Sequence, residues 1–317
     1  MGGHIIHSQK NLIREHLRIR YPGDFERTVL VRGFVERVCL QHTDRDFADA
    51  NFVRELCSGS DTRYWQRLSE ALIGQELLDA DLDVRPSRDG PDFLIIEDGR
   101  KIWVEVICPE PSGIPDAWLQ PVMGQACSFP HEEMLLRWTA AIKEKAAKLL
   151  GDPNSGGVGY RAKGVVGLDD AYVIAVNGRL LRGPAFASIT GISQFPFAVE
   201  AVFAVGPYAI HIDRETLKTV GSGHQHRPTI KKPNGAAVPA YTFLHDDFRP
   251  ISAIWALDID ETSAIGNPKP MAVVHNPIAN IPAPSGLLPA QSEYVPTPIG
   301  IDGYTLDRSP GRLVAHG

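Results

Sequence analysis

The chain has few cysteines and no long apolar segment, and each shortage excludes a class of protein. Four cysteines among 317 residues, without CxxC spacing, favour reduced thiols over a disulfide framework. No apolar run approaches the roughly 20 residues that a membrane-spanning helix requires. Residues 1–7 lack the charged-then-apolar layout of a secretory signal. We therefore expect a cytoplasmic protein that does not associate with membranes.

Basic residues are not in excess either. The formal net charge of -6 argues against a protein that coats nucleic acid by bulk electrostatics. An enzyme with a local basic groove remains compatible with this charge, because affinity depends on where the cations lie. Two local clusters exist, Arg161 with Lys163 and the segment 224–232 (HQHRPTIKK). Solvated loop charge is the alternative interpretation of both.

The first part of the chain predicts helices. Residues 8–57 carry apolar side chains at helical spacing, and Pro22-Gly23-Asp24 interrupts them as a turn. Ser60 and Asp61 then mark the start of a strongly amphipathic helix over 64–78. Residues 82–84 form an expected edge strand in the polar segment that follows.

Two short apolar strands are predicted next, at 93–96 and 102–107, around a Glu-Asp-Gly-Arg turn. Each has a carboxylate, Asp92 at the start of the first and Glu105 within the second. Side chains of a strand alternate between its faces, and burial of an unpaired carboxylate is costly. The two acids therefore need a partner, and Mg²⁺ (or Mn²⁺) is the candidate because it prefers hard carboxylate oxygens.

Later segments complete a mixed α/β pattern. Residues 110–129 form a long loop of the kind that is often functional, and a helix over 131–150 ends at Gly151. We expect further strands at 171–176, 198–205, 251–259 and 271–274. Helices packed on the two sides of a mixed central β-sheet follow from this order. The predicted organisation is an N-terminal helical extension (1–60), an α/β core (61–280) and a Pro/Gly-rich extended tail (281–317).

The helix-strand-strand-helix-strand order over about residues 61–177, with Pro91-Asp92 and Glu105-Val106-Ile107, resembles the PD-(D/E)XK nuclease-like superfamily. The resemblance implies a restriction-endonuclease-like core, nucleic acid as the partner, and Mg²⁺-dependent hydrolysis of phosphodiester bonds in DNA or RNA. It also implies that Asp92 and Glu105 are metal-binding, catalytic acids. One departure from the motif is Ile107, which stands where the family has a lysine and has neither charge nor proton.

The resemblance further implies a third acid on the preceding helix, and two candidates compete. Glu70 matches the family by its distance ahead of the Pro-Asp pair. Glu76 lies between Trp65 and Leu72 on the apolar face, at roughly 100° per residue. An ordinary helix-surface glutamate is the alternative interpretation of either one.

A replacement for the missing lysine is expected from the helix over 131–150, since lysine migration to a neighbouring element occurs in this superfamily. Lys145 lies roughly 70° and Lys143 roughly 90° from the centre of the apolar stripe, so Lys145 is preferred. Lys148 is not expected to contribute. Solvated charges beside Glu144 are the alternative interpretation.

Three functional hypotheses remain open. The first is a metal-dependent nuclease. The second is a catalytically silent nuclease-like domain that binds nucleic acid or a protein, for which Ile107 is the best support. The third is an unrelated α/β protein in which Asp92 and Glu105 are structural, and strands that are not neighbours would decide in its favour. The oligomeric state is open, with a homodimer among the assemblies considered.

Overall fold

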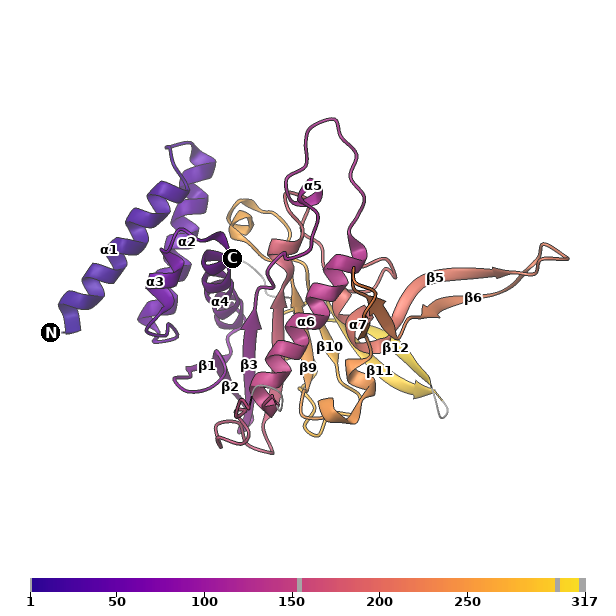
Figure 1. Cartoon of the computed structure of the whole chain (residues 1–317). Helices are drawn as coiled ribbons and strands as arrows, with labels where there is room; N and C mark the ends of the chain where they lie inside the picture. The colour runs from indigo at the N-terminus through magenta and orange to yellow at the C-terminus, as the bar shows by residue number, and fades with distance from the viewer. Residues whose placement is uncertain (1, 153–155, 300–302, 314–317) are drawn as a thin grey trace.

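The computed structural model describes residues 2–152, 156–299 and 303–313. Its centre is an eight-stranded mixed sheet in the order β1-β2-β3-β4-β9-β10-β11-β12 (Figure 1). The strands of this sheet are β1 (Asp83–Pro86), β2 (Phe93–Glu97), β3 (Arg100–Ile107), β4 (Ala171–Asn177), β9 (Ala253–Leu257), β10 (Met271–His275), β11 (Ser292–Ile299) and β12 (Gly303–Pro310). The α-helices are α1 (Gly2–Arg20), α2 (Glu26–Asp44), α3 (Phe52–Leu56), α4 (Asp61–Asp79), α5 (Asp116–Leu119), α6 (His131–Leu150) and α7 (Phe197–Phe203).

The strand pairing confirms the predicted centre of the sheet. Strands β2 and β3 are antiparallel neighbours, with Phe93 opposite Val104. Strand β4 is parallel to β3, with Ile174 opposite Glu105. The mixed α/β class, a large sheet flanked by helices, is therefore correct. The two acid-bearing strands are neighbours, so the arrangement that would have decided for the third hypothesis is not found.

Helices α4 and α6 cover opposite faces of this sheet. The face that packs on α4 contributes Phe93 and Val104 to one apolar cluster. The other face contributes Trp103, Tyr172 and Ile174 to a second cluster that contains α6 residues such as Trp138. Since side chains alternate along a strand, residues next to Val104 face α6.

The N-terminal helices pack beyond α4, on the left in Figure 1. Val35 and Phe52 belong to the same apolar cluster as the α4 side of the sheet. The turn between α1 and α2 falls at the predicted position, where Gly23 has φ 87. The segment 1–60 is thus helical, as expected, and shares its core with the sheet.

The strand predicted at 198–205 is wrong. Residues 197–203 form helix α7, and every one of them is buried. A short continuous apolar run does not distinguish a buried helix from a buried strand, because neither has a polar face that would reveal its period. Pro196 precedes α7, a position at which proline is compatible with a helix start.

Residues 281–317, expected as an extended tail, contribute strands β11 and β12 in their described part. Val273 of β10 pairs with Glu293 of β11, and β11 pairs with β12 along its whole length. Pro296 and Pro298 lie where β11 no longer pairs with β10, so their missing N–H groups remove no bond to that neighbour. The high proline content of this segment concealed the strand.

A two-stranded arm was not predicted. Strands β5 (Val205–Ile212) and β6 (Thr219–His226) extend away from the sheet (Figure 1). The smaller hairpin of β7 (Thr229–Lys231) and β8 (Ala237–Pro239) follows and contacts α6. In the part of the chain that is described, no helix is long and apolar enough to cross a membrane.

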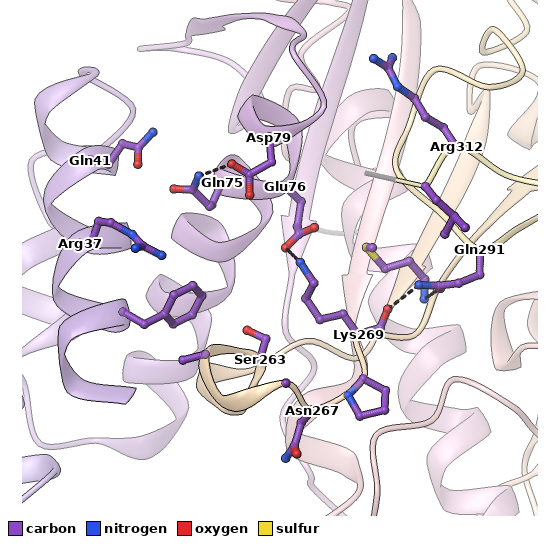
Figure 2. A pocket seen from close by; sticks show the side chains of 16 residues that line it. Arg37, Gln41, Gln75, Glu76, Asp79, Ser263, Asn267, Lys269, Gln291 and Arg312 are labelled. Carbon is purple, nitrogen blue, oxygen red and sulfur yellow. Dashed lines mark hydrogen bonds and ion pairs between the residues drawn. The ribbon is translucent and has the colours of Figure 1, made fainter. Parts of the chain in front are cut away.

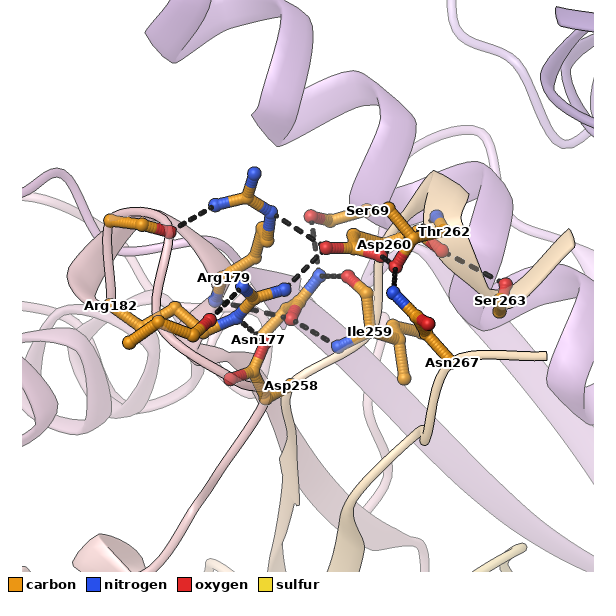
Figure 3. Close-up of polar contacts among 12 residues, drawn as sticks. Ser69, Asn177, Arg179, Arg182, Asp258, Ile259, Asp260, Thr262, Ser263 and Asn267 are labelled. Carbon is orange, nitrogen blue, oxygen red and sulfur yellow. Dashed lines mark hydrogen bonds and ion pairs between the residues drawn. The ribbon is translucent and has the colours of Figure 1, made fainter. Parts of the chain in front are cut away.

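A buried polar network fixes α4 against the ends of β4 and β9 (Figure 3). The amide of Asn177 donates to Ser69 Oγ at 2.9 Å and to the Ile259 carbonyl at 3.0 Å. Its Oδ1 accepts from the Ile259 backbone N–H at 3.1 Å. Arg182 pairs with Asp258 and Asp260 in the same network. Because Ser69 precedes Glu70, these contacts also set the position of that glutamate.

Candidate active site

The backbone of β2 and β3 brings Asp92 and Glu105 to the α6 face of the sheet. Their neighbours Phe93, Val104 and Val106 belong to the cluster on the α4 face, so the two acids face the opposite way. Asp92 Oδ2 accepts a hydrogen bond from the Val106 backbone N–H at 2.6 Å, across the strand pair. Glu105 is almost completely buried, with 1% of its surface exposed. A buried carboxylate of this kind requires partners.

Those partners are two lysines of α6. Lys145 Nζ and Lys148 Nζ each lie 2.8 Å from Glu105 Oε1. Lys145 is buried, whereas the Lys148 side chain is 44% exposed. Tyr160 lines the same pocket as Glu105. Lys145 therefore lies where the sequence predicted it.

Lys148, which was not expected to contribute, also contacts Glu105, whereas Lys143 lies elsewhere. Lys148 follows Lys145 by three residues, a spacing that places two side chains on the same helix face. Lys143 lines a different pocket, beside Lys232, and is not among the residues that line the pocket around the acids. At about 100° per residue, Lys143 and Lys145 lie about 160° apart around the helix axis, on opposite flanks of the apolar stripe, so only one of them can face the acids.

Of the two candidate third acids, Glu70 joins the site. It is buried, and its carboxylate accepts from Arg67 at 2.8 Å and from Gln66 at 3.1 Å. Gln66 in turn accepts from the Cys108 backbone N–H at 3.0 Å, just beyond β3. These contacts connect Glu70 to the end of the strand that carries Glu105.

Glu76 lies in a different pocket, which has a volume of about 910 Å³ (Figure 2). There it forms an ion pair with Lys269 at 2.5 Å. Six residues after Glu70, its side chain is rotated by about 120° around the helix axis. The structure thus does not bring Glu76 to the other acids.

The acids share a pocket of about 680 Å³ between α4 and α6, which we call the acid pocket. The apolar side chain of Ile107 also lines it. The charged and hydroxyl-bearing residues of its centre come from both helices, from β3, from the turn before β2 and from the segment after α6: Glu70, Asp92, Glu105, Lys145, Lys148 and Tyr160.

Burial and mutual repulsion raise the pKa values of two of these acids. The pKa of Asp92 lies well above its usual value of 3.8, first because of burial and then because of the charges of Glu105 and Glu70. Burial likewise raises the pKa of Glu70, although Arg67 opposes the shift. For Lys148, burial lowers the pKa but the Glu105 charge outweighs it, so the pKa is raised. Burial and the neighbouring carboxylates thus both disfavour the charged form of Asp92.

The pKa of Asp92 predicts how stability depends on pH. Between pH 3.8 and the raised value, the folded protein retains a proton that the unfolded chain has lost, so stability falls as pH rises. Asp92→Asn removes this penalty and retains an oxygen that can accept from Val106 N–H. In metal-free urea unfolding, we expect no gain near about pH 4 and a gain that grows as the pH rises through the raised pKa of Asp92.

The exposed Asp89, three residues earlier, provides the control for that experiment. Asp89→Asn should leave the pH dependence of unfolding unchanged. An Asp92→Asn protein whose stability follows the wild-type curve at every pH would show that Asp92 titrates normally in the folded state.

The acids of this pocket are also its possible metal ligands. In the described ranges, no group of three or more His, Cys, Asp or Glu side chains is placed to hold a metal ion. Asp92 and Glu105 are a pair that fits Mg²⁺, since this ion is commonly held by one or two carboxylates together with water and phosphate oxygens. The repulsion of Asp92 by Glu105 and Glu70 is the feature that a cation would relieve.

Some site residues had no recognised signal in the sequence. Gln66 and Arg67 precede Glu70 by four and three residues, so helical spacing would have identified them as its neighbours. Tyr160 follows a Gly-rich segment without periodicity and could not have been placed.

Comparison of the chain with protein-family models, with curated proteins and with solved structures finds no match. The chemistry of the acid pocket is therefore the basis for a functional assignment.

Proposed function

We propose that this protein is a metal-dependent nuclease that hydrolyses phosphodiester bonds in DNA or RNA. Its restriction-endonuclease-like core would consist of α4, β2, β3, α6 and β4, in the element order of the PD-(D/E)XK superfamily. The observation that carries the proposal is the presence of Glu70, Asp92, Glu105 and Lys145 in one pocket. Lys145 supplies, from α6, the amine that position 107 lacks.

Each residue has a specific task in this proposal. Asp92 and Glu105 would hold Mg²⁺ or Mn²⁺ between them, with Asp92 releasing its proton when the cation binds. The bound cation supplies positive charge that activates water and stabilises the phosphate. Lys145 orients the attacking water or the scissile phosphate through its amine, while its aliphatic stem packs along the core.

Cleavage of plasmid DNA and of a structured RNA tests the proposal directly. The wild-type protein should cleave at least one of these substrates with Mg²⁺ or Mn²⁺ and lose this activity when EDTA is added, because the two acids need a cation to act on phosphate. Restoring excess Mg²⁺ should restore cleavage. Undiminished cleavage in EDTA would contradict metal dependence, and no cleavage with either metal on either substrate would contradict the nuclease.

A catalytically silent binding domain is the second candidate. Ile107 favours it, and so does the pairing of Glu105 with two lysines, which compensates that carboxylate without a cation. Such a domain would bind either nucleic acid or a protein partner. A domain that binds only a protein would not bind an oligonucleotide. Binding without cleavage, unaffected by EDTA, is the result that distinguishes a silent nucleic-acid binder from the nuclease.

A further inference from the structure

A second pocket lies next to the acid pocket across the surface of α6. It has a volume of about 450 Å³, and Arg137 and Ala140 line both pockets. Lys143 of α6 and Lys232, just after β7, complete its cationic lining. We call it the lysine pocket.

The cations of the lysine pocket are not neutralised by the protein. Within the described ranges, Arg137, Lys143 and Lys232 form no ion pair, and the buried Nε of Arg137 has no hydrogen-bond partner. Glu133 is the one acidic side chain among the residues that line this pocket. Partial burial, and then the charge of Lys232, lower the pKa of Lys143. An anion placed between the two lysines would relieve their repulsion.

The position of Lys232 is set by its hairpin. The Lys232 backbone N–H donates to the Ala236 carbonyl at 2.8 Å, which closes the turn between β7 and β8. Ile230 of the same hairpin is buried in the cluster that packs on α6. The two lysines therefore come from two packed elements and face one pocket.

We propose that the lysine pocket binds a backbone phosphate of the nucleic-acid strand, a few nucleotides from the phosphodiester that enters the acid pocket. This proposal rests on the proposed function. Helix α6 rises about 12 Å between Arg137 and Lys145, a distance that a few nucleotides of one strand span. Because its net charge is -6, the chain depends on local cations to bind nucleic acid. The lysine pocket supplies three cations without ion pairs next to the acid pocket. The strand would run across the exposed Ala140.

Salt dependence of oligonucleotide binding tests the proposal without requiring cleavage. Asp92→Asn serves as the background, and fluorescence anisotropy measures binding of labelled single-stranded and duplex oligonucleotides in Mg²⁺ over a salt series. Adding Lys143→Ala and Lys232→Ala removes one phosphate contact, so the slope of log K against log salt should become shallower by about 0.7 for a single strand or 0.9 for a duplex. Between about 50 and 200 mM salt, the double variant should lose roughly threefold less affinity than its background.

Matched variants separate this effect from general charge removal and from misfolding. Lys101→Ala with Lys218→Ala removes two exposed lysines outside both pockets and should leave the slope unchanged. Lys143→Arg with Lys232→Arg retains the charges and should restore the background slope, and thermal unfolding verifies the fold of each variant.

The outcomes distinguish the lysine pocket from the proposed nuclease. An unchanged slope in a protein that cleaves nucleic acid would overturn the lysine pocket alone. A shallower slope in a protein that never cleaves would support the pocket and overturn the nuclease. Failure to bind either oligonucleotide, together with absence of cleavage, would overturn both.

Discussion

Asp92→Asn should reduce cleavage by at least about 1,000-fold, equivalent to about 4 kcal/mol of transition-state stabilisation. Asp92 is one of two carboxylates available to share a cation, and the neutral amide is a much weaker ligand for a hard cation. The substitution retains the oxygen that accepts from Val106 N–H, so the β2–β3 pairing remains intact. Single-turnover cleavage of plasmid or RNA, with wild type and variant purified in parallel, measures the difference.

Asp92 is a better position for this test than Glu105. Glu105→Gln would leave the buried Lys145 without its carboxylate, so a loss of activity could reflect local disorder. Asp89→Asn, on the exposed turn before β2, should cleave at the wild-type rate. If Asp92→Asn also cleaved at that rate, Asp92 would be a structural residue and the nuclease proposal would fail.

The elements around the acids could be predicted because each has a local signal. The Asp98-Gly99 turn specifies the β2–β3 hairpin, and both residues adopt positive φ there. The apolar run of β4 is buried on both faces, as its composition indicates. Helix α7 and strand β11 lacked such signals, since the first is apolar all round and the second contains prolines.

The site was predicted in part, for the same reason. Asp92 and Glu105 were identifiable because a carboxylate in an apolar strand is costly and therefore informative. Lys145 was identifiable from its position beside an apolar stripe. Lys148 could have been identified from its three-residue spacing to Lys145. The position of Tyr160 depends on how the segment after α6 lies on the sheet, and no local pattern encodes that placement.

Lys145→Met should lower turnover by about 100-fold or more, because the proposed reaction needs an amine that Ile107 cannot supply. Methionine retains an apolar stem of similar length, so packing against the core is preserved. In this variant Glu105 keeps Lys148 as a partner. The loss of stability should therefore be smaller than the roughly 3–5 kcal/mol that is typical when a buried ion pair is broken. Turnover and urea unfolding of the same preparation separate the two effects.

Lys148→Met should have a smaller effect than Lys145→Met, about tenfold, because its amine reaches Glu105 from a side chain that is 44% exposed. Since both amines donate to Glu105 Oε1, the double variant should depart from additivity. Lys101→Ala, at the far end of β3, is the control for loss of a lysine. If Lys145→Met and Lys148→Met both left turnover unchanged in an active protein, neither amine would replace the missing lysine. If the wild-type protein itself bound nucleic acid but did not cleave it, Lys145 and Lys148 would serve to neutralise Glu105 in a silent binding domain.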